Sequence, residues 1–176
     1  MTLTAAQLRR ILPDATRDNI DRYLPALNAG MAAREIDTPL RAAHFLAQVG
    51  HESGSLRYAE EIASGAAYEG RRDLGNTEPG DGSHFKGRGL IQLTGRANYA
   101  DYGAAIGRDL LADPSPVATD PALAVDVACW FWVAHGLNTL ADADDPERIT
   151  RRINGGLNGY AQRLAILARA RQVLGA

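Results

Sequence analysis

The chain has 176 residues and a formal net charge of −2, with 45% apolar and 23% charged residues. These values are ordinary for one globular domain, and they exclude a strongly basic nucleic-acid-binding protein. No stretch approaches the roughly 20 uncharged apolar residues of a membrane-spanning helix. We therefore expect a single domain over residues 1–176 that is neither a nucleic-acid-binding protein nor a membrane protein.

Three helices are expected in the first part of the chain, because apolar side chains recur there at helical spacing. They cover residues 4–12, 16–35 and 38–52. Pro25 interrupts the second helix, whereas Thr38 and Pro39 form an N-cap and first-turn pair for the third. The first eight residues lack the basic flank and apolar core of a secretion signal. The protein is therefore expected to be made in the cytoplasm.

The third helix carries Glu52 at the end of the apolar run Ala42–Val49, and Glu61 follows nine residues later. A carboxyl group from which water is partly excluded favours proton donation, as a general acid requires. Within one helix, nine steps of about 100° would place the two carboxylates on opposite faces. They can share a cleft only if the helix stops near Gly54. On this segment alone, the alternative is that Glu52 caps local backbone and that Glu60 and Glu61 are solvated.

Residues 64–89 are rich in glycine and poor in apolar side chains, which predicts a long loop or a small strand pair. They run into the polar motif Phe85–Tyr99. There Gln92 and Thr94 alternate with apolar residues, so an extended backbone would place the amide and the hydroxyl on one face. Such a face can hydrogen-bond sugar hydroxyls and position a water. The alternative is a satisfied turn in which Asn98 caps the next helix.

Helices are expected through the remainder of the chain, which makes the expected fold mainly α. They cover residues 96–106, 121–135, 146–153 and 159–174. Cys129 is the only cysteine and lies among apolar residues, so it is expected to be a core residue rather than a nucleophile. The turn Asn154–Gly156 ends a helix naturally, but it also offers an amide beside a tight turn, where substrate-orienting groups are often mounted. Arginines cluster mid-chain and near the end, where they either contact substrate carboxylates or are simply solvated.

These elements, in this order, resemble the family 19 glycoside hydrolases. The matching segments are His51–Gly54, Phe85–Thr94, Asn98–Tyr99 and Asn154–Gly156, with an arginine downstream. The resemblance covers about residues 38–174 and leaves N-terminal helices in residues 1–37. It is closer to phage endolysins and their bacterial relatives than to plant chitinases, which are longer and carry cysteines that this chain lacks. It implies a lysozyme-like, bilobed helical catalytic domain with the long loop or a small β-hairpin beside the active-site cleft.

The resemblance also implies roles for individual residues. Glu52 would be the general acid and Glu61 the general base, whereas Glu60 is out of register. Thr94 would hold the attacking water, and Arg163 would support the environment of the acid. Substrate binding is implied for Gln92, Asn98, Asn154, Arg163, Lys86 and Tyr99.

Two departures from the family pattern bear on the substrate. Ala97 stands where chitinases commonly have a substrate-binding tyrosine, and Asn158 stands where they have a glutamate. Both weaken the inference to chitin and leave the catalytic pair intact. The implied reaction is inverting hydrolysis of a β-1,4 link between amino sugars, with peptidoglycan favoured because arginine-rich surroundings suit its peptide carboxylates. Chitin hydrolysis and lytic transglycosylation are the alternatives.

Two other classes of function remain open from the sequence. His51 and Glu52 are reminiscent of a zinc hydrolase, but Ser55 occupies the position where His-Glu-x-x-His has its second histidine. A non-catalytic glycan-binding module is the other. We expect a monomer with no cofactor and no metal. A wall-degrading enzyme made in the cytoplasm would need release by lysis, a holin or a secretion machine.

Overall fold

The computed structural model describes all residues, 1–176, and shows a mainly helical protein without a β-sheet. Its α-helices are α1 (Ala5–Ile11), α2 (Arg17–Ala33), α3 (Pro39–Glu52), α4 (Asp81–His84), α5 (Arg96–Ile106), α6 (Pro116–Thr119), α7 (Pro121–Ala134), α8 (Leu137–Asp142), α9 (Pro146–Asn154) and α10 (Tyr160–Leu174). The 3₁₀ helices are η1 (Ala66–Tyr68) and η2 (Arg72–Leu74). None of the helices is both long enough and apolar enough to cross a bilayer.

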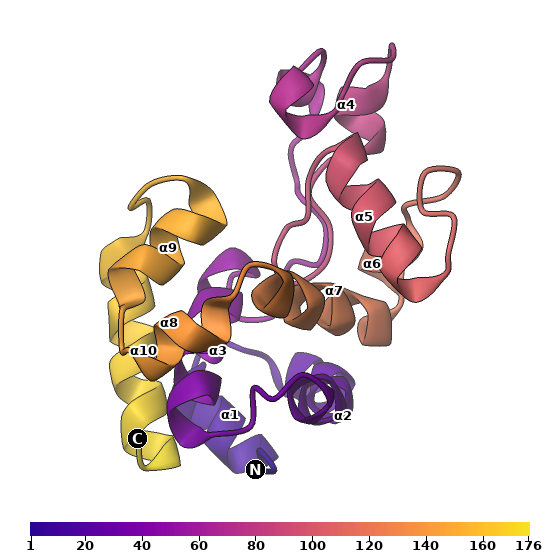
Figure 1. Ribbon diagram of the computed structural model, residues 1–176. Coiled ribbons are helices and arrows are strands. Elements are labelled where there is room, and N and C mark those ends of the chain that lie inside the picture. Colours follow the sequence, from indigo (N-terminus) through magenta and orange to yellow (C-terminus); the bar gives the residue numbers. More distant parts are fainter.

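The helices form two lobes, as the sequence resemblance implies (Figure 1). One lobe contains α1, α2, α3, α8 and α10, and the other contains α4 and α5 with the loops around them. The long helix α7 lies between the two groups. This mainly α, bilobed arrangement confirms the expected fold class.

Helix α3 is the centre of the larger lobe. Its residues Ala42–Gly50 are all buried, and α10 packs along it. At Gly50 an added Cβ would lie 2.5 Å from a methyl group of Leu12 and 3.3 Å from one of Ile166. The absence of a side chain at this position therefore lets the end of α1 and helix α10 approach α3 closely.

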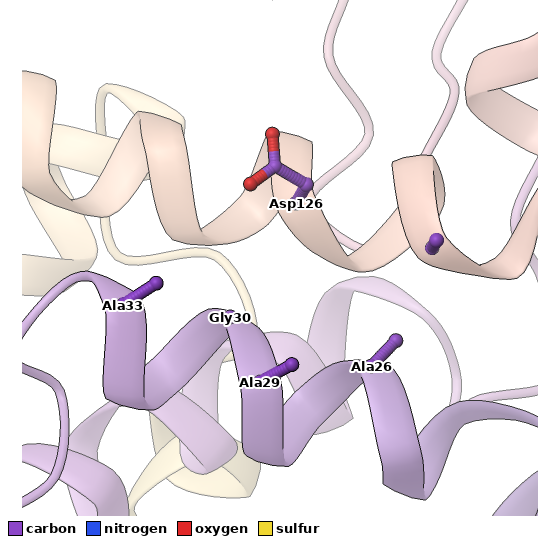
Figure 2. Close-up of a pocket in the computed structure, with 6 residues that line it drawn as sticks. Ala26, Ala29, Gly30, Ala33 and Asp126 are labelled. Carbon is purple, nitrogen blue, oxygen red and sulfur yellow. The ribbon is translucent and has the colours of Figure 1, made fainter.

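Helices α2 and α7 also pack closely, through small side chains. Ala26, Ala29, Gly30 and Ala33 of α2 face α7 (Figure 2), and a Cβ at Gly30 would lie 2.9 Å from the sulfur of Cys129. Cys129 is fully buried, and burial raises the pKa of its thiol to about 12, so the prediction of a core cysteine is confirmed.

The seven long helices predicted from the sequence are present, with ends within two residues of those expected. Pro25 does not interrupt α2, however, because it lies on the exposed face of a helix whose other face is buried through Tyr23 and Leu27. The short helices α6 and α8 were not predicted, since each is too short to show a periodic apolar pattern.

The segment 64–89 is a long loop with short helical turns rather than a strand pair. Its extended pairing is limited to isolated bridges of Arg88 with Glu60 and with Leu93. Hydrogen bonds from side chains to the backbone, rather than strand pairing, hold this loop in its conformation. The Glu69 carboxylate accepts hydrogen bonds from the N–H groups of Gly80 and Gly82, at 2.7 and 2.8 Å.

Candidate active site

Helix α3 ends at Glu52 with a sharp reversal of the chain. The hydroxyl of Ser53 donates to the Val49 carbonyl at 2.6 Å and accepts from the Leu56 N–H at 2.8 Å. Gly54, Ser55 and Leu56 follow with φ of +56°, +61° and +64°, so three successive residues are left-handed. The helix break that the sequence analysis required near Gly54 is therefore present.

This reversal brings Glu52 and Glu61 to the same cavity, which has a volume of about 280 Å³. Its lining residues are Glu52, Tyr58, Glu60, Glu61, Ile62, Ala63 and Gln92. The two carboxylates reach the cavity from different elements, Glu52 from the end of a buried helix and Glu61 from an irregular segment. Because the two carboxylates lie on separate elements, the distance between them can leave room for both a substrate and a water.

A series of buried, hydrogen-bonded polar side chains contacts Glu52. The Arg163 guanidinium of α10 forms an ion pair with the Glu52 carboxylate through Nη2 and donates to the side-chain oxygen of Gln48 through Nη1. The Gln48 amide donates in turn to the Thr150 hydroxyl at 3.3 Å. Arg163 is only 2% exposed, so the prediction that it contacts substrate is wrong. Its guanidinium contacts the Glu52 carboxylate instead, and its role in supporting a catalytic acid stays a prediction.

Glu61 is held by hydrogen bonds to both of its carboxylate oxygens. The Tyr68 hydroxyl donates to Oε1 at 3.0 Å, and the Gly87 N–H donates to Oε2 at 3.2 Å. Burial, together with the hydrogen bond to Glu61, raises the pKa of the Tyr68 hydroxyl, which therefore stays protonated and remains a donor. Each carboxylate oxygen keeps a free lone pair, so Glu61 can still accept a proton from a water in the cavity.

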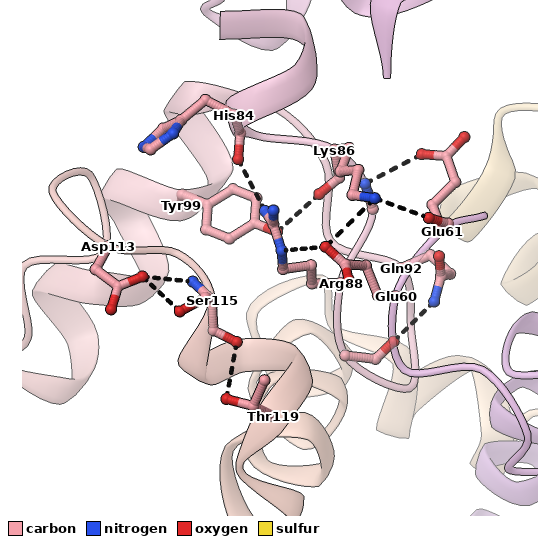
Figure 3. A network of polar contacts seen from close by, with 12 residues as sticks. Glu60, Glu61, His84, Lys86, Arg88, Gln92, Tyr99, Asp113, Ser115 and Thr119 are labelled. Atoms are coloured by element: carbon pink, nitrogen blue, oxygen red, sulfur yellow. Dashed lines mark hydrogen bonds and ion pairs between the residues drawn. The ribbon is translucent and has the colours of Figure 1, made fainter. Parts of the chain in front are cut away.

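Glu60 faces the same cavity but is neutralised by two cations (Figure 3). Its carboxylate lies 3.4 Å from the Lys86 ammonium and 3.1 Å from the Arg88 guanidinium. Lys86 also donates to the Glu61 backbone carbonyl at 3.1 Å. Lys86 therefore lies beside the cavity, where its ammonium contacts the Glu60 side chain and the Glu61 backbone. Substrate binding by Lys86 stays a prediction.

Tyr99 lies behind this network rather than at the cleft. It is fully buried, and its hydroxyl donates to the Lys86 carbonyl at 2.8 Å and accepts from Arg88 at 3.3 Å (Figure 3). Burial raises the pKa of Tyr99 to about 12, so the hydroxyl stays neutral. The prediction that Tyr99 binds substrate is wrong, because a fully buried ring cannot reach a ligand in the cleft.

A second pocket of about 190 Å³ adjoins the first and shares Gln92 with it. Its lining residues are Leu74, Ile91, Gln92, Leu93, Thr94, Asn98, Phe131 and Ile153. Thr94 donates to the Gln92 carbonyl at 2.9 Å, and Asn98 donates to the Thr94 carbonyl at 2.7 Å. Gln92 has φ of +56°, so the extended backbone expected here is wrong, although Gln92 and Thr94 do line the same pocket.

The turn after α9 uses its polar groups internally. The Asn154 amide donates to the Asn158 carbonyl at 3.0 Å, and its side-chain oxygen accepts from the Gly156 N–H at 2.8 Å. The same Asn158 carbonyl accepts from Nε of Arg163 at 3.4 Å. Asn154 does not line either pocket, and its observed contacts order the turn that steadies Arg163.

The histidines are engaged with other groups. His44 is buried with Nε2 2.9 Å from the Asp144 carboxylate, and Nδ1 of His51 lies 2.8 Å from the Gln162 side-chain oxygen. No three His, Cys, Asp or Glu side chains lie close enough together to hold a metal ion. The residues of this chain thus offer no zinc-hydrolase ligand set.

Two supporting residues were missed from the sequence. Gln48 lies four residues before Glu52, so the two side chains share one face of the helix. A polar residue on that face, within an apolar run, was the signal that the sequence offered. Tyr68 lies in the long loop seven residues after Glu61, and no local pattern connects it to the site.

Comparison with known proteins gives consistent similarities. Residues 29–143 match the glycoside hydrolase 19 family described as chitinase class I. A Haemophilus influenzae protein described as containing a glycosyl hydrolase family 19 domain is 31% identical over 93% of this chain and 92% of its own length. An Arabidopsis thaliana endochitinase is 38% identical over 85% of this chain, which spans only 49% of that protein. The crystal structure of chitinase C from Streptomyces griseus HUT6037 superposes with a TM-score of 0.82, at 27% identity, over 99% of this chain and 93% of the other.

Proposed function

The chain belongs to glycoside hydrolase family 19, and from that premise we propose that it cleaves β-1,4 links between amino sugars by an inverting mechanism. Glu52 is the general acid and Glu61 the general base in this proposal. The observation that carries it is the shared cavity: two carboxylates reach it from separate elements, and each is held in place by donors of its own.

In the proposed reaction Glu52 donates its proton to the oxygen of the leaving sugar as the glycosidic bond breaks. Glu61 removes a proton from a water, and this water attacks the anomeric carbon from the opposite face. An inverting enzyme needs room for that water between its two carboxyl groups, which are typically about 6.5–9.5 Å apart. Acid and base catalysis each contribute on the order of 10²–10⁴ in rate.

The side chains in and beside the second pocket have proposed roles in substrate binding. Thr94 uses its proton in a hydrogen bond to the Gln92 carbonyl, so its oxygen is left as an acceptor for the attacking water or a sugar hydroxyl. Gln92 and Asn98 offer amide groups on the same wall, and the turn at Asn154 lies next to the pocket residue Ile153. Lys86 steadies Glu60 and Glu61 in this scheme.

We favour peptidoglycan as the polymer and propose an endolysin-like muramidase that acts on the cell wall after release from the cytoplasm. Ala97 and Asn158 depart from the chitinase pattern at two positions, and arginines cluster in the middle and near the end of the sequence. Chitin is the second candidate, because several similar proteins are described as chitinases or endochitinases.

Mass spectrometry of digested peptidoglycan tests the proposal directly. New reducing N-acetylmuramic acid ends are expected from a muramidase, whereas anhydro ends would establish a lytic transglycosylase. Release of oligosaccharides from colloidal chitin, with none from peptidoglycan, would establish a chitinase. Binding without any cleavage would identify a glycan-binding module.

The catalytic assignment is tested by Glu52→Gln, which keeps the size of the side chain and removes its acid. It is expected to abolish cleavage while leaving the melting temperature close to that of the wild type. A folded Glu52→Gln protein with wild-type activity would overturn the assignment. Glu61→Gln should also reduce turnover, by a smaller factor where solvent replaces the base.

A further inference from the structure

The N-terminus of α5 is capped by a residue from the long loop. Gly95, at the N-cap position, has no side chain that could accept a hydrogen bond from the first turn. The N–H of Arg96, the first residue of the helix, donates instead to the side-chain oxygen of Asn76 at 2.8 Å. Asn76 is fully buried and lies 20 residues earlier in the chain, so the loop and the helix are joined at this point.

The other half of the Asn76 amide holds the loop itself. Its side-chain nitrogen donates to the Tyr68 carbonyl at 2.9 Å. A backbone N–H needs the amide oxygen and a carbonyl needs the amide nitrogen, so Asn76 uses both polar groups in opposite directions. A carboxylate or an aliphatic side chain could not serve both partners.

The loop and α5 also approach each other closely beside Asn76. A Cβ at Gly75 would lie 2.8 Å from the Cβ of Ala97, and a Cβ at Gly95 would lie 2.7 Å from the Cβ of Leu74. Helix α5 in turn packs into the core through its own buried face. The position of Asn76 is therefore set by α5 as well as by the loop.

Tyr68 depends on such a support because the core does not hold it. None of the residues of η1 (Ala66–Tyr68) is buried. The Tyr68 carbonyl also accepts from the Arg71 N–H at 3.2 Å, but Arg71 belongs to the same exposed turn. The hydrogen bond from Asn76 is thus the contact that ties the Tyr68 backbone to α5.

The other end of Tyr68 reaches Glu61, where its hydroxyl donates to Oε1 at 3.0 Å. A series of contacts therefore runs from the α5 backbone through Asn76 and Tyr68 to the Glu61 carboxylate. The tyrosine ring between the backbone and the hydroxyl is rigid. A shift of the Tyr68 backbone would consequently carry the hydroxyl away from Glu61.

We propose that Asn76 is a positioning residue for Glu61 and acts through the Tyr68 hydroxyl. This inference rests on the proposed function, since it concerns how the general base is held. Asn76 lines neither the cavity shared by Glu52 and Glu61 nor the adjoining pocket. It should therefore affect turnover and leave substrate binding unchanged.

Asn76→Asp separates the two hydrogen bonds of the amide. The carboxylate still accepts from the Arg96 N–H, and the positive end of the α5 dipole favours it there. It has no N–H for the Tyr68 carbonyl and repels that oxygen. Asn28→Asp is the matched control, because the Asn28 amide likewise accepts from the Leu3 N–H at 2.7 Å and donates to the Leu3 carbonyl at 2.9 Å, in the larger lobe.

The first measurement does not depend on cleavage. Fluorotyrosine is incorporated, and the fluorine NMR resonance of Tyr68 is assigned as the one lost in Tyr68→Phe. Glu61→Gln should shift this resonance in the wild-type background and in Asn28→Asp, because the hydroxyl contacts the Glu61 carboxylate. In Asn76→Asp the same Glu61→Gln change should leave the resonance in place, since the contact is already lost.

The second measurement is steady-state kinetics on the substrate that the wild type cleaves, a soluble peptidoglycan fragment or a chitin oligosaccharide. Asn76→Asp should lower kcat about fivefold with KM unchanged, and Asn28→Asp should change neither. Added to Tyr68→Phe, Asn76→Asp should lower kcat by less than about twofold, because the two substitutions remove the same contact.

Wild-type kcat in a folded Asn76→Asp protein would overturn the inference. So would a loss of kcat that multiplies in full with that of Tyr68→Phe, since that pattern is expected of a purely structural residue. A Tyr68 resonance that ignores Glu61→Gln in the wild-type background, or still responds to it in Asn76→Asp, would do the same. If Asn76→Asp does not fold, Asn76→Ala takes its place, and failure of both to fold would make Asn76 purely structural.

The proposed function fails separately. A wild-type protein that cleaves neither polymer, but whose Tyr68 resonance depends on Asn76 in the expected way, would refute catalysis and leave the positioning of Glu61 standing. Cleavage by the wild type together with an unaltered Asn76→Asp protein would keep the proposed function and remove only the role of Asn76.

Discussion

Gln48 is predicted to position Glu52, the proposed general acid, although it does not line the cleft. The side chain is 2% exposed, and its oxygen accepts from Nη1 of Arg163, whose Nη2 holds Glu52. Gln48→Met preserves the length and approximate volume of the side chain and removes its polar atoms. The substitution therefore leaves a buried guanidinium N–H without a partner and frees Arg163 to shift relative to Glu52.

The magnitudes follow from these contacts. A buried hydrogen bond to a charged group contributes about 1.5–3 kcal/mol, so the free energy of unfolding should fall by about that amount. Misplacing a catalytic group by about 1 Å can lower the rate about 100-fold, and we expect kcat to fall between 10- and 100-fold. KM should change little, because Gln48 belongs to neither pocket.

Steady-state kinetics and urea unfolding of three variants separate positioning from simple destabilisation. Thr150→Val removes the other hydrogen bond of Gln48 and leaves the contact with Arg163, so it should keep kcat near the wild-type value. Gln48→Glu supplies a carboxylate that draws Arg163 away from Glu52, so kcat should fall although the protein remains folded. Wild-type kcat in folded Gln48→Met and Gln48→Glu proteins would refute the reasoning.

Three further predictions concern other contacts. Tyr68→Phe removes the hydroxyl donor to Glu61, so kcat should drop about tenfold while the free energy of unfolding changes by only about 1 kcal/mol. Steady-state kinetics and urea unfolding measure these two quantities. An unchanged kcat would contradict the role of the hydroxyl. The ion pair with Arg96 lowers the pKa of Asp81 from 3.8 to about 2, so its stabilisation is complete above about pH 4 and is lost as the pH falls towards 2. Between about pH 4 and 2 the free energy of unfolding should therefore fall more steeply with pH for the wild type than for Asp81→Asn, and parallel curves in urea unfolding would contradict this. Burial lowers the pKa of His44 below 6.5, so the unfolded chain takes up its proton first and stability should fall as the pH drops below about 6.5. His44→Gln should flatten this dependence between pH 7.5 and 5.5 in urea unfolding, and an unaltered slope would assign it to other groups.

Local sequence was sufficient for the long helices and for the break after α3. Periodic apolar residues and N-caps such as Thr38 act within one or two turns, so their effect can be read from neighbouring residues. The nine-residue interval between Glu52 and Glu61 required a reversal, and Ser53 with the left-handed residues 54–56 provides it. The resemblance to family 19 likewise depended on ordered local motifs.

Only the tertiary structure decided which polar residues of those motifs face the cleft. Tyr99 and Arg163 belong to the predicted site by sequence, but both are buried and act through Lys86 and Glu52, respectively. Gln92 keeps its predicted place in the pocket through a left-handed turn instead of an extended segment.

The same distinction applies to the supports of the two glutamates. Gln48 and Arg163 are separated by 115 positions, and they meet only because α10 packs along α3. Sequence spacing describes which residues share one helix face, whereas burial and partnership depend on how separate helices pack against each other. For this protein, the sequence determined the order of the helices and indicated Glu52 and Glu61 as candidate acids, and packing decided which side chains hold these two carboxylates in place.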